Sequence, residues 1–446
     1  MTEHDTIFAL ATAPGRAGIA VLRLSGPRAA AALTALTGAL PAPRQAQRAR
    51  FRDPETGEAI DDGIALYFAA PRSFTGEDVA ELQVHGSRAV VAALIEALAR
   101  QKGLRLAEPG EFTRRAFENG KLDLTAAEGL ADLVAAETSA QRRQALRQLG
   151  GELGRLYEGW RARLLRALAH GEAEIDFPDE GLPGDIAAAV RQEAAALRVE
   201  MAAHLADDRR GERLRDGVSV AIIGPPNAGK SSLMNALARR DVAITSAIAG
   251  TTRDVIEVAL DLGGYPVVLA DTAGLRVVSD ALEEEGVRRA RARAAAADLR
   301  LLVLDATQPG TAVTLRSIVD GDTLVIANKM DLVGGGAAGW ADQLAGGAAL
   351  RLSVATGEGM AGLLARLEAE IARRFAPGGA PLITRVRHRA ALQEAVAALE
   401  RFAEAPLPEL AAEDLRGATR ALGRITGRVD VEDMLDIIFR EFCIGK

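Results

Sequence analysis

A glycine-rich stretch near the middle of the chain constrains the possible folds more than any other feature. Residues 224–232 match the pattern GxxxxGK[ST] and directly follow the apolar run 218–223. A strand, a glycine-rich turn and a helix in this order predict a phosphate-binding loop in a parallel α/β domain. Lys230, a catalytic candidate, can bring an ammonium to the β and γ phosphates, and Ser231 can offer its hydroxyl to Mg²⁺. The nucleotide contacts expected from this loop are Asn227, Ala228, Gly229, Lys230, Ser231 and Ser232.

A second motif, Asp271-Thr272-Ala273-Gly274, follows the apolar run 267–270. At the end of a strand, the carboxylate of Asp271 can hold Mg²⁺ through water, and Gly274 can swing toward a γ-phosphate. Ras-like enzymes place a water-orienting glutamine directly after this glycine, but here that position is Leu275, which cannot orient water. Hydrolysis therefore needs another group, and Glu283 in the acidic cluster 283–285 is a candidate base. The alternative reading of this cluster is a solvated helix start.

A third motif, Asn328-Lys329-Met330-Asp331, follows the apolar run 324–327 and indicates which nucleotide binds. The carboxylate of Asp331 can accept both N–H donors of a guanine edge, whereas adenine presents no such pair. The sequence therefore predicts GTP. The usual guanine-ribose motif Ser-Ala-Lys is only approximated at residues 352–355, where Ser353 is the candidate contact.

The length of 446 residues allows about three domains. The hydrophobic pattern changes along the chain, with β-like runs in some regions and helical spacing in others. Short β-like runs at 19–22 and 64–68 mix with a helical stretch at 88–100, which predicts an α+β domain. The predicted domains are an N-terminal α+β domain (1–118), a first helical segment (119–215), an inserted α/β GTPase domain (216–375) and a second helical segment (376–446). The second helical segment is too short for a core of its own, so we expect it to pack on the first as one discontinuous helical domain.

Charge and cysteine content limit the possible partners and the compartment. With 54 basic and 61 acidic residues the net charge is −7, so any nucleic acid must be held by a local basic patch. The Arg-rich strings 287–293 and 385–389 are candidates, although a solvated helix face is the simpler reading. A single cysteine, an acidic N-terminus without an apolar stretch, and no run of eighteen apolar residues predict a cytoplasmic protein that does not span a membrane.

Lysine is rare in this chain, because nearly every basic residue is arginine. The five lysines are Lys102, Lys121, Lys230, Lys329 and Lys446. Where arginine serves for a bare charge, the remaining lysines are expected at sites that need a compact ammonium. Four of the five fall within motifs, and Lys102 does not.

Together these motifs resemble those of the bacterial tRNA modification GTPases of the MnmE, or TrmE, family. The resemblance covers essentially the whole chain, because the regions on both sides of the GTPase domain carry family motifs. A ribosome-assembly GTPase would not share them. The matching stretches are 11–16 (ATAPGR), 73–78 (SFTGED), 109–117 (PGEFTRRAF), 119–124 (NGKLDL), 224–237 (GPPNAGKSSLMNAL), 250–254 (GTTRD), 271–274 (DTAG), 328–331 (NKMD) and 442–446 (FCIGK).

The resemblance implies a multidomain homodimer built through folate-binding-like N-terminal domains. Each would bind a one-carbon tetrahydrofolate derivative, either the 5-formyl or the 5,10-methylene form. With the FAD-binding partner MnmG (GidA), in a heterotetramer, such proteins add a carboxymethylaminomethyl or aminomethyl group to C5 of the wobble uridine of certain tRNAs. The positions that match the family's folate site are Arg23, Glu81, Lys121 and Lys446.

The resemblance also implies that two GTPase domains dimerise around a potassium ion, which takes the place of an arginine finger. Glu283 matches the family's catalytic glutamate, which answers the question raised by Leu275. Thr252 matches the switch threonine that, with Ser231, reaches Mg²⁺, and Thr251 and Thr252 join the nucleotide contacts. The matching potassium ligands are Asn227, Ser246, Ile248 and Thr251.

Cys443 has two readings. A lone cysteine in an apolar helix is usually a small buried hydrophobe, but the family's terminal motif reaches toward the folate, so its thiol is also a catalytic candidate. Two rival functions are a regulatory GTPase of ribosome assembly and a folate-binding scaffold with vestigial GTPase activity. The terminal FCIGK and the absence of a KH-like GXXG module oppose the first, and the intact Lys230, Ser231, Asp271 and Asp331 oppose the second.

Overall fold

The structure is a computed structural model. It describes residues 5–176, 186–240, 242–244, 257–271, 295–309, 316, 319–333, 339–375, 380–429, 432–440, 442 and 445. By their contacts the residues fall into two units. The first consists of Met1–Ala131, Gln148–Arg198 and Glu394–Lys446, and the second of Asp132–Arg147 and Val199–Gln393.

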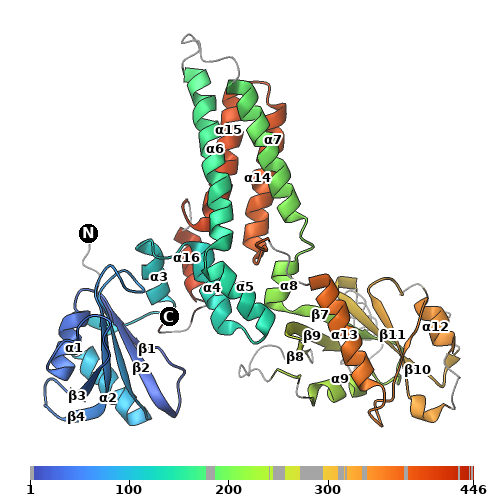
Figure 1. Cartoon of the computed structure of the whole chain (residues 1–446), viewed down its shortest axis with the longest axis horizontal. Helices are drawn as coiled ribbons and strands as arrows, with labels where there is room; N and C mark the ends of the chain where they lie inside the picture. Colours follow the sequence, from blue (N-terminus) through green and yellow to red (C-terminus); the bar gives the residue numbers. More distant parts are fainter. Residues whose placement is uncertain are drawn as a thin grey trace, which may run out of the picture. The chain divides into compact units, whose positions relative to one another are not determined.

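Two six-stranded sheets and a set of helices make up these units (Figure 1). The strands of the first sheet are β1 Thr6–Leu10, β2 Ala17–Ser25, β3 Gln47–Arg52, β4 Ala59–Phe68, β5 Val79–Gly86 and β6 Leu104–Leu106. The strands of the second are β7 Val218–Ile223, β8 Glu257–Leu262, β9 Tyr265–Asp271, β10 Leu299–Asp305, β11 Thr323–Asn328 and β12 Leu350–Arg351. The helices are α1 Ala29–Thr37, α2 Arg88–Ala99, α3 Glu111–Glu118, α4 Leu124–Ala135, α5 Ser139–Leu149, α6 Glu152–Asp176, α7 Ile186–Leu205, α8 Arg210–Asp216, α9 Lys230–Ala238, α12 Gly339–Ala345, α13 Met360–Phe375, α14 Val386–Glu404, α15 Pro408–Thr426 and α16 Glu432–Arg440, and a 3-10 turn, η3, spans Met330–Leu332.

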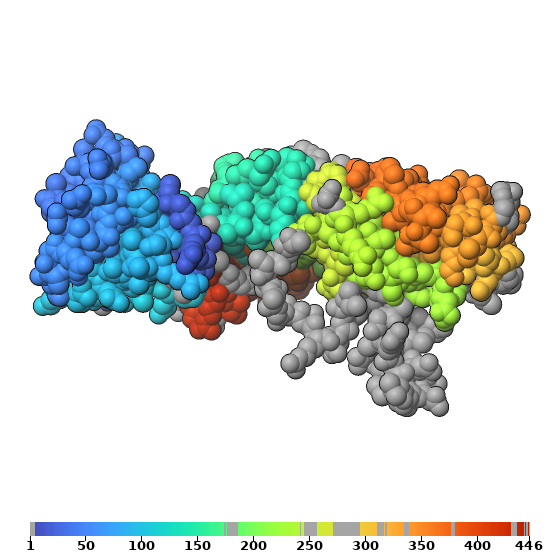
Figure 2. Space-filling model, turned by 90° about the horizontal axis from the view of Figure 1, so that it is seen from below, coloured from blue at the N-terminus to red at the C-terminus, as the bar shows by residue number. Residues whose placement is uncertain are grey.

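The N-terminal sheet has the strand order β3-β4-β5-β2-β1-β6 and is antiparallel except for the β1–β6 pair. Alternation along β2 and β5 sends Leu22, Leu24 and Leu82 to one face, where they form a core with α1 and α2. The intervening Arg23 and Glu81 therefore lie on the opposite face. In Figure 2 the residues of this sheet and its helices, in blue, form one continuous body. The predicted α+β domain is confirmed.

A bundle of helices comes from two distant stretches of the chain. Figure 1 shows α6, α7, α14 and α15 side by side, with α6 and α15 in close contact. Arg416 of α15 pairs with Glu172 of α6 at 2.7 Å, and buried Leu415 and Leu422 lie on the inner face of α15. This confirms the predicted discontinuous helical domain. Within the described ranges, no helix is both long enough and apolar enough to cross a membrane.

The second sheet has the order β12-β11-β10-β7-β9-β8, and all neighbouring strands are parallel except β8 and β9. Both faces are covered by apolar cores, which explains why its strands read as continuous hydrophobic runs. The apolar runs at 218–223, 267–270 and 324–327 all lie in strands, as predicted.

Strand β8 forms one edge of this sheet and is antiparallel to β9. Gly263 and Gly264 connect it to β9 with φ angles of +60° and +88°, the backbone that a two-residue hairpin turn requires. Helix α5 begins against this turn, where the N–H of Ala140 donates to the carbonyl of Gly264 at 2.9 Å. The turn is therefore fixed by a helix from an earlier stretch of the chain.

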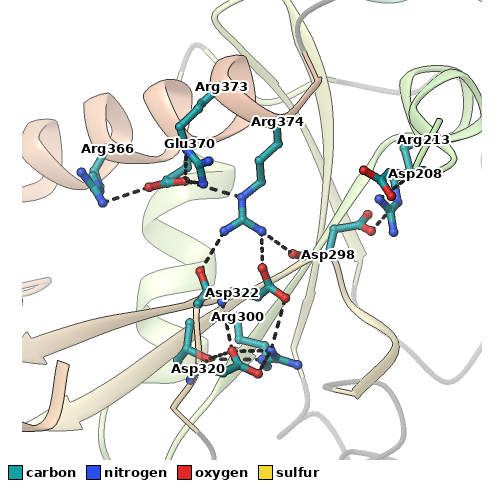
Figure 3. Close-up of polar contacts among 12 residues, drawn as sticks. Asp208, Arg213, Asp298, Arg300, Asp320, Asp322, Arg366, Glu370, Arg373 and Arg374 are labelled. Carbon is teal, nitrogen blue, oxygen red and sulfur yellow. Dashed lines mark hydrogen bonds and ion pairs between the residues drawn. The ribbon is translucent and has the colours of Figure 1, made fainter. Parts of the chain in front are cut away.

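Ion pairs hold the helices at the amino-terminal ends of β10 and β11 (Figure 3). Arg374 of α13 contacts Asp322 at 2.5 Å, and Arg213 of α8 contacts Asp298 at 2.6 Å. The guanidinium of Arg213 also lies 5.7 Å from the ring centre of Phe375. These contacts hold α8 and α13 at the amino-terminal edge of the parallel strands. The carboxyl ends of the strands lie at the opposite edge.

Arg115 in α3 supports a stability prediction for the N-terminal domain. It is 5% exposed and contacts Glu77 at 3.1 Å and Glu111 at 3.0 Å. Arg115→Met keeps the apolar stem but removes the cation that both carboxylates share, so we expect a loss of about 3–5 kcal/mol in unfolding free energy. Arg114→Met, next to it and 40% exposed, should cost less than about 1 kcal/mol. Calorimetric unfolding of both variants checks this, and equal losses would contradict it.

Candidate GTPase site

The phosphate-binding loop joins β7 to α9 through an unusually constrained backbone. Gly224 has φ +142° and Gly229 has φ +100°, and Asn227 also adopts a positive φ of +61°. A Cβ atom on Gly224 would lie 2.1 Å from the carbonyl oxygen of Val303 in β10. Only glycine fits so close to the neighbouring strand. The loop is thus held against the sheet before α9 begins.

Lys230 fills the inner side of this loop. The residue is 9% exposed, and its Nζ donates to the carbonyls of Gly224 at 2.9 Å and Pro225 at 2.8 Å. Ser231 in the first turn of α9 and Asn227 in the loop are exposed. An ammonium, the first N–H groups of a helix and an exposed hydroxyl together suit a phosphate group with its metal ion.

Asn328 connects the phosphate-binding loop to the loop after β12. It is buried, its Nδ2 donates to the carbonyl of Ala228 at 2.8 Å, and its Oδ1 accepts from the N–H of Val354 at 3.1 Å. Ser353 is fully buried, and its Oγ accepts from the N–H of Thr356 at 3.2 Å. One amide side chain therefore joins two loops at the carboxyl edge of the sheet.

Lys329 and Asp331 follow at the same edge. Lys329 has φ +64°, and its Nζ contacts Oδ2 of Asp305 at 2.7 Å. Asp331 lies exposed in η3. Burial alone raises the pKa of Asp305, but hydrogen bonds from Lys329 and Thr307 outweigh burial and lower that pKa below its ordinary value. The carboxyl of Asp305 is therefore ionised at neutral pH.

Sequence reasoning missed Asp305. A signal was present, because Asp305 directly follows the buried run 301–304 at the end of a parallel strand. In the sheet it lies beside Asn328 in register. Polar residues at the carboxyl ends of neighbouring parallel strands gather at one edge, where ligands of such sheets bind.

Several predicted residues lie outside the described stretches of the chain. Asp271 is described only by its backbone, as the last residue of β9, in register with Ile222 before the phosphate-binding loop. The predicted residues outside the described ranges are Ser246, Ile248, Thr251, Thr252, Thr272, Ala273, Gly274, Glu283, Cys443 and Lys446.

The N-terminal domain brings the remaining candidates for a folate site around one loop. Arg23 and Glu81 face each other across β2 and β5, and two guanidinium nitrogens of Arg23 lie 2.9 and 3.0 Å from Oε1 of Glu81. The guanidinium also lies 5.7 Å from the ring centre of Phe74. Lys121 reaches the same loop, where its Nζ donates to the carbonyl of Pro71 at 2.8 Å.

The Arg-rich string 385–389 is neither a free basic patch nor a solvated face. Arg385 pairs with Asp132 at 2.7 Å and is 12% exposed. Arg389 is 14% exposed and pairs with Asp207 at 2.7 Å and with Glu212 at 3.0 Å. Arg389 thus holds α14 to the segment around α8, and Arg385, just before α14, pairs with a carboxylate of α4. The other string, 287–293, lies outside the described residues.

A phosphate-binding loop after β7, with the Asn328–Asp331 motif two strands away on a mainly parallel sheet, defines a P-loop GTPase. Comparison with known proteins narrows this class. The family described as MnmE helical domain matches residues 124–443, and the family described as GTP-binding protein TrmE N-terminus matches residues 6–121.

Relatives match the chain along its whole length. The tRNA modification GTPase MnmE of Parvibaculum lavamentivorans is 60% identical over 448 residues, which are 99% of this chain and 100% of the relative. The tRNA modification GTPase MnmE of Rhodospirillum rubrum is 59% identical and covers 99% of each chain. The chain therefore belongs to the MnmE family of tRNA modification GTPases and is a GTP hydrolase.

Proposed function

We propose that this protein is a potassium-activated GTPase that modifies tRNA in the cytoplasm. Acting as a homodimer with the FAD-dependent partner MnmG (GidA), it adds a carboxymethylaminomethyl or aminomethyl group to C5 of the wobble uridine of certain tRNAs. The one-carbon unit comes from a tetrahydrofolate derivative. The observation that carries the proposal is the match of both the N-terminal and the helical regions of the chain to one family of tRNA modification GTPases.

In this proposal the residues of the second sheet bind and orient GTP. The N–H groups at the start of α9 and the ammonium of Lys230 face the phosphates, and the carboxylate of Asp331 accepts the two N–H donors of guanine. Asn328 keeps the phosphate loop and the base loop in register, as its bonds to Ala228 and Val354 support. Glu283 acts on the attacking water.

The donor atoms fit the expected cations. Mg²⁺ and K⁺ both prefer oxygen ligands, and the exposed hydroxyl of Ser231 and the exposed amide of Asn227 supply them beside the phosphate loop. Ser231 with Thr252 would hold Mg²⁺, and Asn227 with Ser246, Ile248 and Thr251 would hold K⁺. When bound, the two cations supply positive charge for the phosphates as they react.

The N-terminal domain would hold the folate. Glu81 is 19% exposed, and only its Oε1 is engaged by Arg23, so its Oε2 can accept the N–H edge of a pterin. Lys121, with Lys446, would meet the carboxylates of the folate tail. Cys443 would lie near the one-carbon unit. A regulatory role in ribosome assembly is less well supported, because it leaves the family match of residues 6–121 without a purpose.

Initial rates of GTP hydrolysis in matched KCl and NaCl buffers test the proposal. We expect potassium to stimulate hydrolysis by about tenfold or more, because it replaces the charge of an arginine finger. Glu283→Ala and Asn227→Ala should both lose this stimulation. The modified wobble nucleoside should form only when MnmG, folate, GTP and a nitrogen donor, ammonium or glycine, are all supplied, as detected by mass spectrometry of tRNA. Equal rates in the two salts would contradict potassium activation, and an unmodified tRNA would contradict the folate chemistry.

A further inference from the structure

The ion pair of Asp305 and Lys329 lies at the edge of the sheet where the guanine motif begins. Asp305 is 7% exposed and is the last residue of β10, in register with Asn328 of β11. Both of its carboxylate oxygens are occupied. Oδ2 accepts from Nζ of Lys329 at 2.7 Å, and Oδ1 accepts from the Oγ1 and the N–H of Thr307 at 2.6 and 3.0 Å.

This arrangement fixes the side chain of Lys329 at both ends. Its backbone is in the left-handed region at φ +64°, between Asn328, which contacts the phosphate loop, and Asp331. Its ammonium is anchored on a buried carboxylate that Thr307 holds in turn. The side chain of Lys329 is still 31% exposed. A lysine whose charged end is held inside presents its four-carbon stem as an apolar strip.

A fixed apolar strip beside Asp331 suits the flat face of a purine. A free lysine side chain would lose rotamer freedom when a base settles on it, which weakens binding. A lysine already held by an ion pair avoids that loss, so the site is preorganised for its ligand. An ion pair elsewhere on the surface, away from Asp331, would not affect nucleotide binding.

We propose that Asp305 is a positioning residue for the guanine nucleotide and acts through Lys329. By holding the ammonium, it keeps the stem of Lys329 against the base and slows release of GDP and GTP. The inference rests on the proposed function, in which Asp331 of the same motif binds guanine, and it adds a contact between the stem of Lys329 and the base.

The same sheet offers a matched control at its opposite edge. Arg300 and Asp320 form an ion pair at 2.5 Å before β11 begins, and Asp320 is 56% exposed (Figure 3). Asp320→Asn removes one carboxylate charge, as Asp305→Asn does, but it lies at the amino-terminal ends of the parallel strands, away from the guanine motif.

Dissociation of a fluorescent GDP from the full-length protein, followed after mixing with excess GDP, is the main test. We expect Asp305→Asn to release GDP about tenfold faster, the change that loss of one charge-assisted hydrogen bond implies. At saturating GTP its kcat should stay within about twofold of the parent, because binding and not the chemical step is affected. Asp320→Asn should release GDP at the parent rate.

A double-mutant cycle separates this inference from the proposed contact. Lys329→Ala alone should release GDP faster, and Asp305→Asn added to it should cause no further increase. If Lys329→Ala leaves release unchanged, the contact with the base fails. If Lys329→Ala accelerates release and Asp305→Asn does not, the positioning role of Asp305 fails while the contact stands.

Thr307→Val provides a second variant that keeps all charges. It removes the hydroxyl that donates to Asp305, so we expect release to quicken by about two- to threefold. Thermal unfolding of each variant shows whether it folds. If Asp305→Asn does not fold, unchanged release in Thr307→Val overturns the inference, and faster release with an unchanged kcat supports it.

Discussion

Asp331→Asn is expected to lower GTP affinity by about 100-fold and to raise the affinity for xanthosine triphosphate. The carboxylate of Asp331 can accept both N–H donors of guanine, whereas an asparagine amide would set its own N–H against one of them and leave that donor unpaired. Xanthine carries a carbonyl oxygen at that position, which the amide can meet. Competition of GTP and xanthosine triphosphate against a fluorescent analogue measures both affinities and so the change in preference.

Asp320→Asn serves as the control, because Asp320 lies before β11 and pairs with Arg300. It should retain the preference for GTP with affinity within about twofold. An Asp331→Asn variant that still prefers GTP would show that another group reads the base. Loss of both nucleotides together would instead indicate that the loop around η3 had been damaged.

Much of the fold could be predicted because hydrophobic pattern and strand burial agree. The strands at 218–223 and 324–327 lie in a sheet whose two faces are both covered, so their residues can be apolar almost without interruption. Such continuous apolar runs can be recognised in the sequence. Helix α15 is likewise amphipathic, and the spacing of Leu415 and Leu422 along it indicates the face that packs in the bundle. These signals are local and need no knowledge of distant contacts.

Other features depend on contacts between distant residues, which no local pattern reveals. The antiparallel β8 is set by the Gly263-Gly264 turn, and the run of β8 alone does not disclose its direction. Arg115 reads as one more arginine in an amphipathic helix, yet it is buried between Glu77 and Glu111. A charged side chain can be buried only where the folded chain brings oppositely charged partners to it, and the local sequence does not show which residues these are.

For the candidate GTPase site, the motifs located the loops but not the side chains that support them. Asn328 was expected at the nucleotide, and in the structure it also bonds to Ala228 in the phosphate loop. Lys121, Lys230 and Lys329 each donate from Nζ to a specific oxygen. Asp305, the partner of Lys329, belongs to no motif. Its position after the run 301–304 was its one sequence signal, and the register of β10 and β11 places it beside Asn328.

Gly224→Ala is expected to weaken GTP binding by at least about 100-fold and to destabilise the GTPase domain. A Cβ atom at this position would lie 2.1 Å from the carbonyl oxygen of Val303, and the φ of +142° is strained for any residue but glycine. Because Val303 is a buried backbone position within β10, between β7 and β11, no side chain can move aside to relieve the contact. The strand or the loop must shift instead.

A shift of either the loop or the strand disrupts the phosphate-binding site. Moving the loop displaces the carbonyl of Gly224 that holds Lys230, and moving β10 breaks its parallel pairing with β7. We expect the free energy of unfolding to fall by about 2–5 kcal/mol and the affinity for a fluorescent GTP analogue to fall by at least about 100-fold.

Gly321→Ala is the matched control, because no atom lies within 4 Å of its added Cβ. It should change stability by less than about 0.5 kcal/mol and leave binding intact. If Gly224→Ala bound GTP as tightly as Gly321→Ala, the close approach of loop and strand would not be what shapes the phosphate site. Weak binding restored at high GTP would instead point to a strained but intact loop, because ligand binding energy can offset the cost of its distortion.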